Sequence, residues 1–506
     1  MSNIPTPLKE LVERSKFLGA NQDFVVYGGG NTSAKGEITD HFNRTKNVLW
    51  VKGSGADMMN AEAVDYPALY MDELIQILKF EKLSDEEMTD LVSRALVDPA
   101  SRRPSIETLL HAFLPFKHID HLHPDAAIAI AAAKDGEKIT KELFKGAIGW
   151  VPWQRPGFDL GLQLKKCLED NPGIRGIMLG SHGLFTWGDT AYESYMNTLE
   201  VIEICAQYLE DSYVKKGAAF KGQKIQSLPK EERTNQAAAI APLLRGLCSS
   251  ETKMVGNFTD DDRVLEFINS NDLARLAPMG TSCPDHFLRT KIAPLVLAIP
   301  ADADIKNNAE IKKQIEPKFV AYRKMYAEYY EKCKRDNSPA IRDANPVVIL
   351  YPGVGMFTFA KDKQTARVAG EFYINAINVM KGAEAISSYT SLPLQEAFNI
   401  EYWLLEEAKL QRMPKPKALK GKIALVTGSG GGIGKAIAHK FASEGACVIL
   451  SDNNLERLQA AKDEFIKAYG KDAVASDVLD VTDANSIKKT MQTACLQFGG
   501  LDIIVN

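Results

Sequence analysis

Apolar and polar residues follow two alternating periods along most of the chain. From residue 1 to about 245, short apolar runs such as Gly176–Leu179 are followed by glycine turns and by longer stretches with apolar residues at helical spacing. Residues from about 250 to 410 repeat this texture and include a long polar helix around Lys318–Asp336. Alternating strands and helices are typical of α/β domains, so we expect an α/β fold in both regions.

The chain has 506 residues, which is too long for one ordinary domain. A basic, proline-bearing segment, Gln411–Lys420 (QRMPKPKALK), has the composition of an interdomain linker. The pattern therefore predicts a first domain at residues 1–245, a second region at 246–410, a linker at 411–420 and a last domain at 421–506.

The last region begins with a short strand-turn-helix-strand pattern. An apolar strand at Ile423–Thr427 leads through a glycine-rich turn into a helix at Lys435–Glu444, and a second strand follows at Cys447–Leu450. Glycines let the backbone approach a pyrophosphate at the N-terminus of such a helix. Asp452 follows the second strand, where a carboxylate accepts hydrogen bonds from a ribose and favours NAD over NADP. We expect a Rossmann-type parallel sheet.

The spacing TGxxxGxG, which starts at Thr427, resembles the short-chain dehydrogenase/reductase family. The resemblance implies that the following residues contact the cofactor: Gly428, Ser429, Gly432, Ile433, Gly434, Asp452, Asp480, Val481 and Asn506. It also implies that Asn506 is the first asparagine of the motif at the fourth strand. The family's catalytic Tyr-xxx-Lys pair would lie beyond this point. We therefore expect a truncated domain with an exposed sheet edge, an incomplete NAD site and no dehydrogenase activity.

Charge and composition exclude several classes of function. The net charge is −4 and basic residues are scattered, which gives no bulk attraction to nucleic acid or to an anionic membrane. The N-terminus lacks the apolar core of a signal peptide, and no run of about 18 apolar residues exists. The seven cysteines lack a CxxC pair and are expected to be reduced core residues of a cytoplasmic protein.

The segment HIDHLHPD at residues 118–125 contains three of the eight histidines. In a strand, residues i and i+2 project from the same face, so His121 and His123 could bind one metal ion while His118 faces the other way. A polar strand end is the alternative. His182, between a buried strand and a glycine, is the candidate third ligand, although on its own it would be interpreted as a hydrogen-bonded buried histidine.

Two small-residue loops have the composition of anion-binding turns. They are GGGNTSAK at residues 28–35 and VKGSGAD at residues 51–57, and each on its own is also compatible with a simple turn. Together with Ser105, which follows a proline, they could form a cradle of hydroxyls and backbone N–H groups. Lys35 and Lys52 could add positive charge.

These motifs, in this order, resemble the class II aldolase/adducin family: GNTS at 30–33, SG at 54–55, PSIE at 104–107, HLH at 121–123 and SHGLFTWG at 181–188. The resemblance implies that His121, His123 and His182 ligate Zn²⁺ and that Glu107 is the acid/base residue. It implies a phosphate site made of Gly30, Asn31, Ser33, Ser54, Gly55 and Ser105. Ile106 stands where aldolases often have a second serine, so one phosphate hydrogen bond is in doubt.

The combined regions resemble bifunctional rhamnulose-1-phosphate aldolase/lactaldehyde dehydrogenase proteins. The resemblance implies zinc-dependent cleavage of a ketose 1-phosphate, most simply L-rhamnulose 1-phosphate, to dihydroxyacetone phosphate and L-lactaldehyde. Zinc held by neutral imidazoles would act as a Lewis acid. Fuculose 1-phosphate would give the same aldehyde. A sugar-phosphate 4-epimerase and a non-enzymatic adducin-like module are the alternatives, and the family implies a homo-tetramer.

The middle region contains an internal similarity to the first. Tyr351–Asp362 (YPGVGMFTFAKD) aligns with GSHGLFTWGDT, with Val354 at the position of His182. Upstream, Pro284–Leu288 aligns with Ile119–His123, which sets His286 against His121. We hypothesise a degenerate second copy of the aldolase unit that lacks metal ligands and supports packing or pocket shape. Chance similarity between two strand ends is the alternative.

Overall fold

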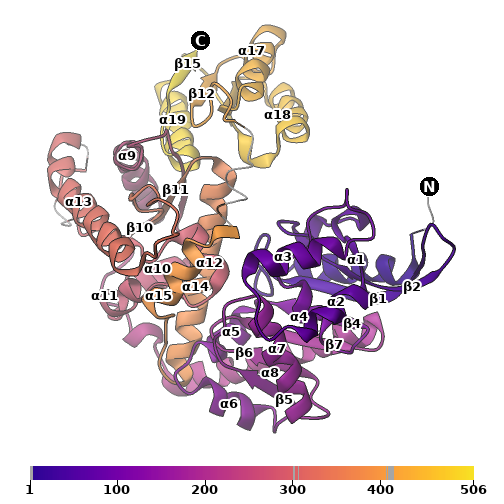
Figure 1. Ribbon diagram of the computed structural model, residues 1–506. Coiled ribbons are helices and arrows are strands. Elements are labelled where there is room, and N and C mark those ends of the chain that lie inside the picture. Colours follow the sequence, from indigo (N-terminus) through magenta and orange to yellow (C-terminus); the bar gives the residue numbers. More distant parts are fainter. Residues whose placement is uncertain (1–3, 300–302, 306, 406, 408–414) are drawn as a thin grey trace. The chain divides into compact units, whose positions relative to one another are not determined.

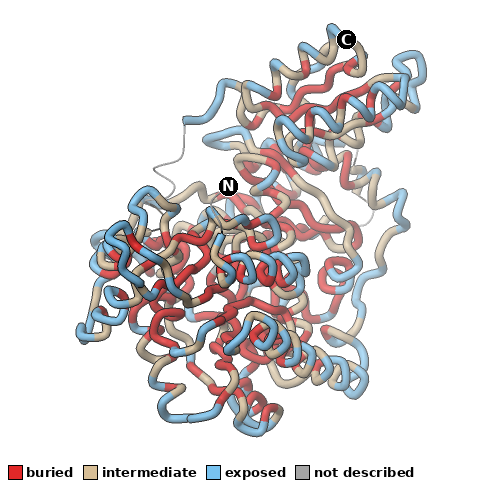
Figure 2. Tube along the Cα trace, turned by 90° about the vertical axis from the view of Figure 1, so that its right-hand side faces the viewer, coloured by how far each residue is buried: buried red, intermediate tan, exposed pale blue. Residues whose placement is uncertain are grey.

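The computed structural model describes residues 4–299, 303–305, 307–405, 407 and 415–506 (Figure 1). It divides into two compact units. Unit 1 consists of Met1–Ala219, Ser282–Asp285 and Asn378–Glu396, and unit 2 of Phe220–Thr281, His286–Ile377 and Ala397–Asn506. Figure 2 shows that buried residues are concentrated along the interior of each unit. Two short segments of the second predicted region therefore belong to the first unit.

Unit 1 is built on a seven-stranded sheet with the order β3-β2-β1-β4-β7-β6-β5. Its strands are β1 (Asn31–Thr39), β2 (Thr45–Val51), β3 (Ala68–Tyr70), β4 (His118–Leu122), β5 (Ile148–Val151), β6 (Gly176–Leu179) and β7 (Gly183–Gly188). All neighbouring strands are antiparallel except β5 and β6, which are parallel. The α/β class expected from the sequence is confirmed.

Helices cover both faces of this sheet. They are α1 (Thr6–Gly19), α2 (Met71–Gln76), α3 (Asp85–Arg94), α4 (Thr108–Ala112), α5 (Asp125–Ala131), α6 (Gly136–Leu143), α7 (Phe158–Asp170) and α8 (Ala191–Lys216). Alternation along β6 divides the core: Met178 packs in the cluster that contains residues of α5 and α8, and Ile177 packs in the cluster that contains residues of α7. Both faces are buried, which explains the continuous apolar run of this strand.

The first sheet of unit 2 has four strands in the order β8-β11-β10-β9. The strands are β8 (Val255–Thr259), β9 (Leu295–Val296), β10 (Val348–Tyr351) and β11 (Gly355–Ala360). The accompanying helices are α9 (Lys230–Cys248), α10 (Asp262–Ile268), α11 (Leu273–Leu276), α12 (Pro284–Thr290), α13 (Asn308–Cys333), α14 (Lys363–Ile386) and α15 (Leu394–Glu401). The long polar helix begins ten residues before the expected start, at Asn308, because Asn307 caps it by accepting from the Glu310 backbone N–H.

The two sheets share one topology over four strands. In sequence order, β4, β5, β6 and β7 correspond to β8, β9, β10 and β11, with the same neighbours and the same directions. A three-residue loop joins the last two strands in both sheets, and it ends at His182 in one and at Val354 in the other. This strand order is what a duplicated unit requires, and the duplication itself stays a prediction.

The upstream part of the expected alignment is wrong. Residues 284–290 form helix α12, so they are not the counterpart of strand β4. The ladders give the correct correspondence, because Asp120 pairs with Thr186 whereas Asn257 pairs with Thr358. Phe258 therefore takes the place of His121. The Asp-His pair shared by the two segments had suggested a match, but one segment is a helix and the other is a strand.

The last region forms a parallel sheet with the order β14-β13-β12-β15. Its elements are β12 (Ile423–Val426), α17 (Gly432–Ser443), β13 (Cys447–Asp452), α18 (Leu455–Tyr469), β14 (Val474–Val478), α19 (Ala484–Phe498) and β15 (Ile503–Val505). The helix expected from residue 435 starts three residues earlier, at Gly432. Of the predicted linker Gln411–Lys420, residues 411–414 lie outside the described residues.

No helix among the described residues is both long enough and apolar enough to cross a membrane.

Candidate metal centre

Strand β4 presents two different polar faces. His118 and Asp120 point to one face, where Arg14 of α1 hydrogen-bonds both, with its Nε 2.8 Å from Asp120 Oδ1 and one terminal nitrogen 2.9 Å from His118 Nδ1. Burial and the charge of Arg14 lower the pKa of His118 to about 3, so its ring is a neutral acceptor. His121 and His123 lie on the side away from this network, as strand alternation predicts.

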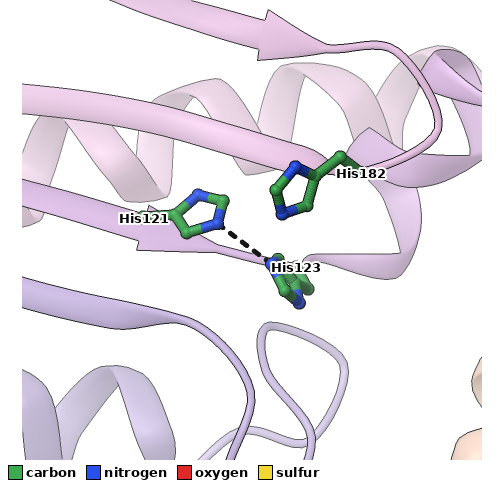
Figure 3. A group of neighbouring side chains, drawn as sticks. All are labelled: His121, His123 and His182. Atoms are coloured by element: carbon green, nitrogen blue, oxygen red, sulfur yellow. Dashed lines mark hydrogen bonds between the residues drawn. The ribbon is translucent and has the colours of Figure 1, made fainter. Parts of the chain in front are cut away.

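The loop between β6 and β7 brings the third histidine to the other two (Figure 3). Leu179 pairs with Gly183, so Gly180, Ser181 and His182 form a tight connection. Ser181 adopts a positive φ of 52°, which turns the chain. A Cβ at Gly183 would lie 2.6 Å from the backbone oxygen of Leu122 and 2.7 Å from the His123 ring. Glycine is therefore required where this loop passes β4.

The imidazole rings of His121, His123 and His182 converge on one buried point. Their ring centroids are 4.8, 5.0 and 5.2 Å apart, and His123 Nε2 lies 3.1 Å from His121 Nε2. His121 Nδ1 lies 3.1 Å from the backbone oxygen of Leu184, which fixes Nδ1 as the protonated nitrogen and leaves Nε2 free to bind a metal. Burial lowers the pKa of His182 to about 4, so this ring is neutral at pH 7. Three imidazole nitrogen donors fit Zn²⁺.

Glu107 directs its carboxylate at the same point from the start of α4. Its Oε1 lies 3.4 Å from the Nε2 atoms of both His121 and His182. Burial acts to raise the pKa of Glu107, but the charge and hydrogen bonding of His121, followed by those of His182, bring it well below its ordinary value. Glu107 is therefore an ionised carboxylate next to the histidine nitrogens, where it can exchange a proton with a bound substrate.

A buried chain of hydrogen bonds orients Glu107. Asn31 donates from Nδ2 to Glu107 Oε2 at 2.5 Å, and its Oδ1 accepts from His111 Nε2. The other nitrogen of His111, Nδ1, accepts from the Ser33 hydroxyl at 2.7 Å. Burial lowers the pKa of His111 to about 3, so the ring is neutral and has one donor and one acceptor. The side chains of Asn31 and Ser33 are used within this chain, and their expected phosphate contacts stay a prediction.

The structure brings the small-residue loops together. Lys52 Nζ donates to the backbone oxygens of Ala56 at 2.7 Å and Gly28 at 3.3 Å, which ties the two glycine loops to each other. The backbone N–H of Ser54 donates to the backbone oxygen of Arg103, two residues before Ser105. Gly30 and Gly55 have positive φ values of 56° and 75°. These turns form one group, with Ser54, Gly55 and Ser105 partly or fully exposed.

The two lysines do not supply the freely available charge that the sequence suggested. Lys35 is partly buried, its Nζ donates to the Leu114 backbone oxygen, and burial lowers its pKa to about 7. Lys52 is 3% exposed, and the carbonyl oxygens just described hold its ammonium group. Any phosphate in this cradle would therefore be bound mainly by N–H groups and hydroxyls.

Two residues of the second predicted region contribute to this site without any sequence motif that announces them. Cys283 lies in unit 1 with its Sγ 3.8 Å from His123 Nδ1 and 3.6 Å from the backbone oxygen of His182. Farther along, Glu396 accepts a hydrogen bond of 3.0 Å from Trp153, whose ring centroid lies 6.2 Å from that of His182. Neither residue belongs to a recognisable motif, and only the tertiary fold brings them to the histidines.

The expected nucleotide-binding residues gather at the carboxyl ends of the parallel strands. The Gly430 backbone N–H donates to Asp452 Oδ2 at 3.1 Å, which fixes the glycine turn beside the end of β13. A Cβ at Gly434 would lie 2.4 Å from the Gly428 oxygen, so close packing requires glycine there. The remaining expected positions are the buried Ser429, Gly432 and the exposed Ile433 in the first turn of α17, Asp480 and Val481 after β14, and Asn506 after β15.

Three protein families match consecutive parts of the chain. The Class II Aldolase and Adducin N-terminal domain matches residues 9–209, the second domain of class II aldolase matches residues 235–410, and the short chain dehydrogenase family matches residues 422–506. The matched ranges agree with the order of the three sheets along the chain.

Two relatives match this chain over very different lengths. YuxG of Bacillus subtilis (strain 168), named an uncharacterized oxidoreductase, is 38% identical over 506 residues, which is all of this chain and 73% of the relative. The hydroxynaphthalene reductase-like protein Arp2 of Metarhizium guizhouense is 44% identical over 92 residues, 18% of this chain. The chain spans only 34% of the length of that relative.

One solved structure similar to this chain is the N-terminal class II aldolase domain of a conserved protein from Thermoplasma acidophilum. It is 33% identical with a TM-score of 0.38, and the match covers 41% of this chain and 96% of that chain.

Proposed function

We propose that unit 1 is a zinc-dependent aldolase. The premise is that this chain belongs to the class II aldolase and adducin family and continues into a short-chain dehydrogenase region. The proposed reaction of unit 1 is the cleavage of a ketose 1-phosphate to dihydroxyacetone phosphate and an aldehyde. L-Rhamnulose 1-phosphate, which gives L-lactaldehyde, is the proposed substrate.

The observation that carries this proposal is the convergence of three imidazoles and one carboxylate on a single buried point. His121, His123 and His182 would hold the ion. A divalent cation bound by neutral ligands keeps its full charge and would stabilise negative charge on the oxygens of the ketose. This donor set also argues against an adducin-like module without catalysis, which would need none of these side chains.

The residues of the chain would divide the remaining work. Cleavage removes a proton from the hydroxyl beside the breaking carbon–carbon bond, and the carbanion left on the dihydroxyacetone phosphate fragment must then gain a proton. Glu107 would take up the hydroxyl proton and deliver a proton to the carbanion, and Asn31 holds Glu107 in orientation. The loops at Gly30, Ser54 and Ser105 would bind the phosphate, which lies away from the breaking bond, and so orient the substrate.

The fused dehydrogenase region supports an aldehyde as one product, because an aldehyde is a plausible dehydrogenase substrate. We propose NAD as the cofactor of that region. Asp452 lies at the end of β13 with its carboxylate held by the Gly430 N–H, and it would accept hydrogen bonds from the ribose hydroxyls. Titration of the chain with NADH and NADPH, followed by nicotinamide fluorescence, should show preferential binding of NADH, and Asp452→Ala should remove that preference.

The test of the aldolase proposal is a cleavage assay on the full chain with L-rhamnulose 1-phosphate and L-fuculose 1-phosphate. Dihydroxyacetone phosphate should be released only after Zn²⁺ is restored to chelator-treated protein. His123→Ala and Glu107→Gln should lose at least about a hundredfold in kcat/KM, since each acts at the reacting centre. The exposed His41 is the matched control, and His41→Ala should keep full activity.

Two results would reject the proposal. Full cleavage activity in His123→Ala would exclude the metal assignment. Formation of an isomeric sugar phosphate without release of dihydroxyacetone phosphate would instead identify a 4-epimerase. The proposed homo-tetramer and cytoplasmic location stay predictions, and sedimentation of the purified chain tests the first of them.

A further inference from the structure

The thiol of Cys283 contacts two of the three histidines although it lies 101 residues after His182 in the chain. It is 1% exposed and belongs to the short segment Ser282–Asp285 that joins unit 1. Its Sγ is 3.6 Å from the His182 backbone oxygen, toward which the S–H donates. The same sulfur is 3.8 Å from His123 Nδ1. One side chain of the second region thus connects two separate ligand-bearing segments.

The nitrogen of the His123 ring that faces the sulfur determines which hydrogen bond the thiol can make. His123 Nε2 is the nitrogen that faces His121, at 3.1 Å, and Nδ1 is the nitrogen that faces Cys283. A thiol whose hydrogen is directed at a carbonyl presents a sulfur lone pair, which accepts a hydrogen bond from Nδ1–H. This arrangement keeps the proton on Nδ1 and leaves the Nε2 lone pair directed at the metal point.

We propose that Cys283 is a positioning residue of the metal centre, which sets the tautomer and orientation of His123 and anchors the His182 loop. Cys283 is not itself a ligand. The inference rests on the proposed metal site and does not depend on which sugar phosphate is cleaved. It gives the second region a defined contribution to the site: one hydrogen-bonding group beside the ligands.

The experiment measures metal affinity rather than turnover. Full-length protein is freed of metal with a chelator and then titrated with Zn²⁺ in competition with a chromophoric chelator. Cys283→Ala should weaken Zn²⁺ binding by roughly 10–100-fold, the usual effect of removing a group that orients a ligand histidine. Cys283→Ser keeps a donor and an acceptor and should stay within about fivefold of the parent protein.

Cys167 provides the matched control. It is also buried in unit 1, and its Sγ donates to a backbone carbonyl, that of Trp150, at 3.7 Å, but in a separate apolar cluster. Cys167→Ala makes the same atomic change without touching a ligand and should leave Zn²⁺ affinity unchanged. A loss of affinity through general loosening of the unit would lower both alanine variants equally and would overturn the proposal.

Binding of Co²⁺ in place of Zn²⁺ separates the remaining outcomes and does not require the alanine variant to fold. The parent protein and Cys283→Ser should give the same visible spectrum, with no thiolate-to-cobalt charge-transfer band. Such a band in the parent protein would make Cys283 a direct ligand and overturn the inference. Equal Zn²⁺ affinity in the parent and Cys283→Ala would also overturn it. Failure of the parent protein to bind either ion would instead reject the proposed metal site.

Discussion

Asn31 and Glu107, 76 residues apart in the chain, are joined by a hydrogen bond of 2.5 Å between Asn31 Nδ2 and Glu107 Oε2. Asn31 Oδ1 accepts a hydrogen bond from His111 Nε2. A flip of the Asn31 amide by 180° would therefore break both this bond and the bond to Glu107. The second oxygen of Glu107 is thereby left to face the histidine nitrogens. The orientation of Glu107, the proposed acid/base residue, thus depends on a neutral side chain in the first strand of the sheet.

Replacement of Asn31 by alanine should change the pH dependence of cleavage. Without the amide donor, the ionised form of Glu107 loses a hydrogen bond, so its pKa rises. We expect the acidic limb of the kcat/KM profile to move to higher pH and the maximal rate to fall roughly 10–100-fold. Asn60→Ala, which breaks an exposed amide–carboxylate bond to Asp57, is the control and should leave the profile unchanged. A lower rate with an unshifted acidic limb would contradict the prediction.

Replacement of Arg14 by methionine should destabilise unit 1 strongly. Arg14 and Asp120 are 2% and 0% exposed, and loss of the guanidinium leaves a buried carboxylate without its cation. The expected loss is about 3–5 kcal/mol, measured from thermal unfolding. The exposed pair Arg94–Asp90 provides the comparison, and Arg94→Met should cost less than about 1 kcal/mol. Equal losses of unfolding free energy in the two variants would show that the buried pair contributes no more to stability than the exposed pair.

Two glycines of the same loop should respond differently to alanine. Both have positive φ, 75° at Gly28 and 56° at Gly30, so either substitution costs about 1 kcal/mol of backbone strain. A Cβ at Gly30 would also lie 2.7 Å from the backbone oxygen of His121, whereas a Cβ at Gly28 meets nothing within 4 Å. Gly30→Ala should therefore weaken Zn²⁺ binding as well as stability, and Gly28→Ala should affect stability alone. Titration of both variants with Zn²⁺ checks the difference.

Protonation of His118 should account for part of the loss of folding stability at acidic pH. Its pKa is about 3 in the folded protein, because of burial and the charge of Arg14, against 6.5 ordinarily. The unfolded chain therefore binds the proton more readily, so stability is lost as pH falls below about 6.5. At pH 5 this difference amounts to about 2 kcal/mol. His118→Asn keeps an acceptor for Arg14 without the titration, and its melting temperature should fall less between pH 7 and pH 5. Parallel decreases in the two proteins would contradict the assignment.

Local periodicity predicted the parts of the site that lie within single elements. Two-residue spacing placed His121 and His123 on one face of β4 and His118 on the other, and the ladder with β1 and β7 has that geometry. The glycine after His182 predicted a tight turn, which the structure has. These inferences succeed because side-chain direction in a strand follows from backbone geometry alone.

Contacts between distant segments could not be predicted from the sequence. Nothing in the neighbourhood of Asn31 or Ser33 indicates that their side chains serve His111 and Glu107 within the fold. The same holds for Cys283, which looked like any other core cysteine. The misplaced alignment of His286 has a related cause, because a short similarity of letters carries no information on whether the backbone is strand or helix.

The position of Cys283 in the chain also affects the order in which the site is assembled during synthesis. A ribosome adds roughly 5–20 residues per second, and domains generally fold from the N-terminus as they emerge. The 101 residues between His182 and Cys283 then correspond to roughly 5–20 seconds of synthesis, during which the three histidines exist without their thiol neighbour. On our proposal, the nascent chain would hold the three histidines before Cys283 could set the tautomer of His123, so binding of the ion and final orientation of its ligands would be successive events.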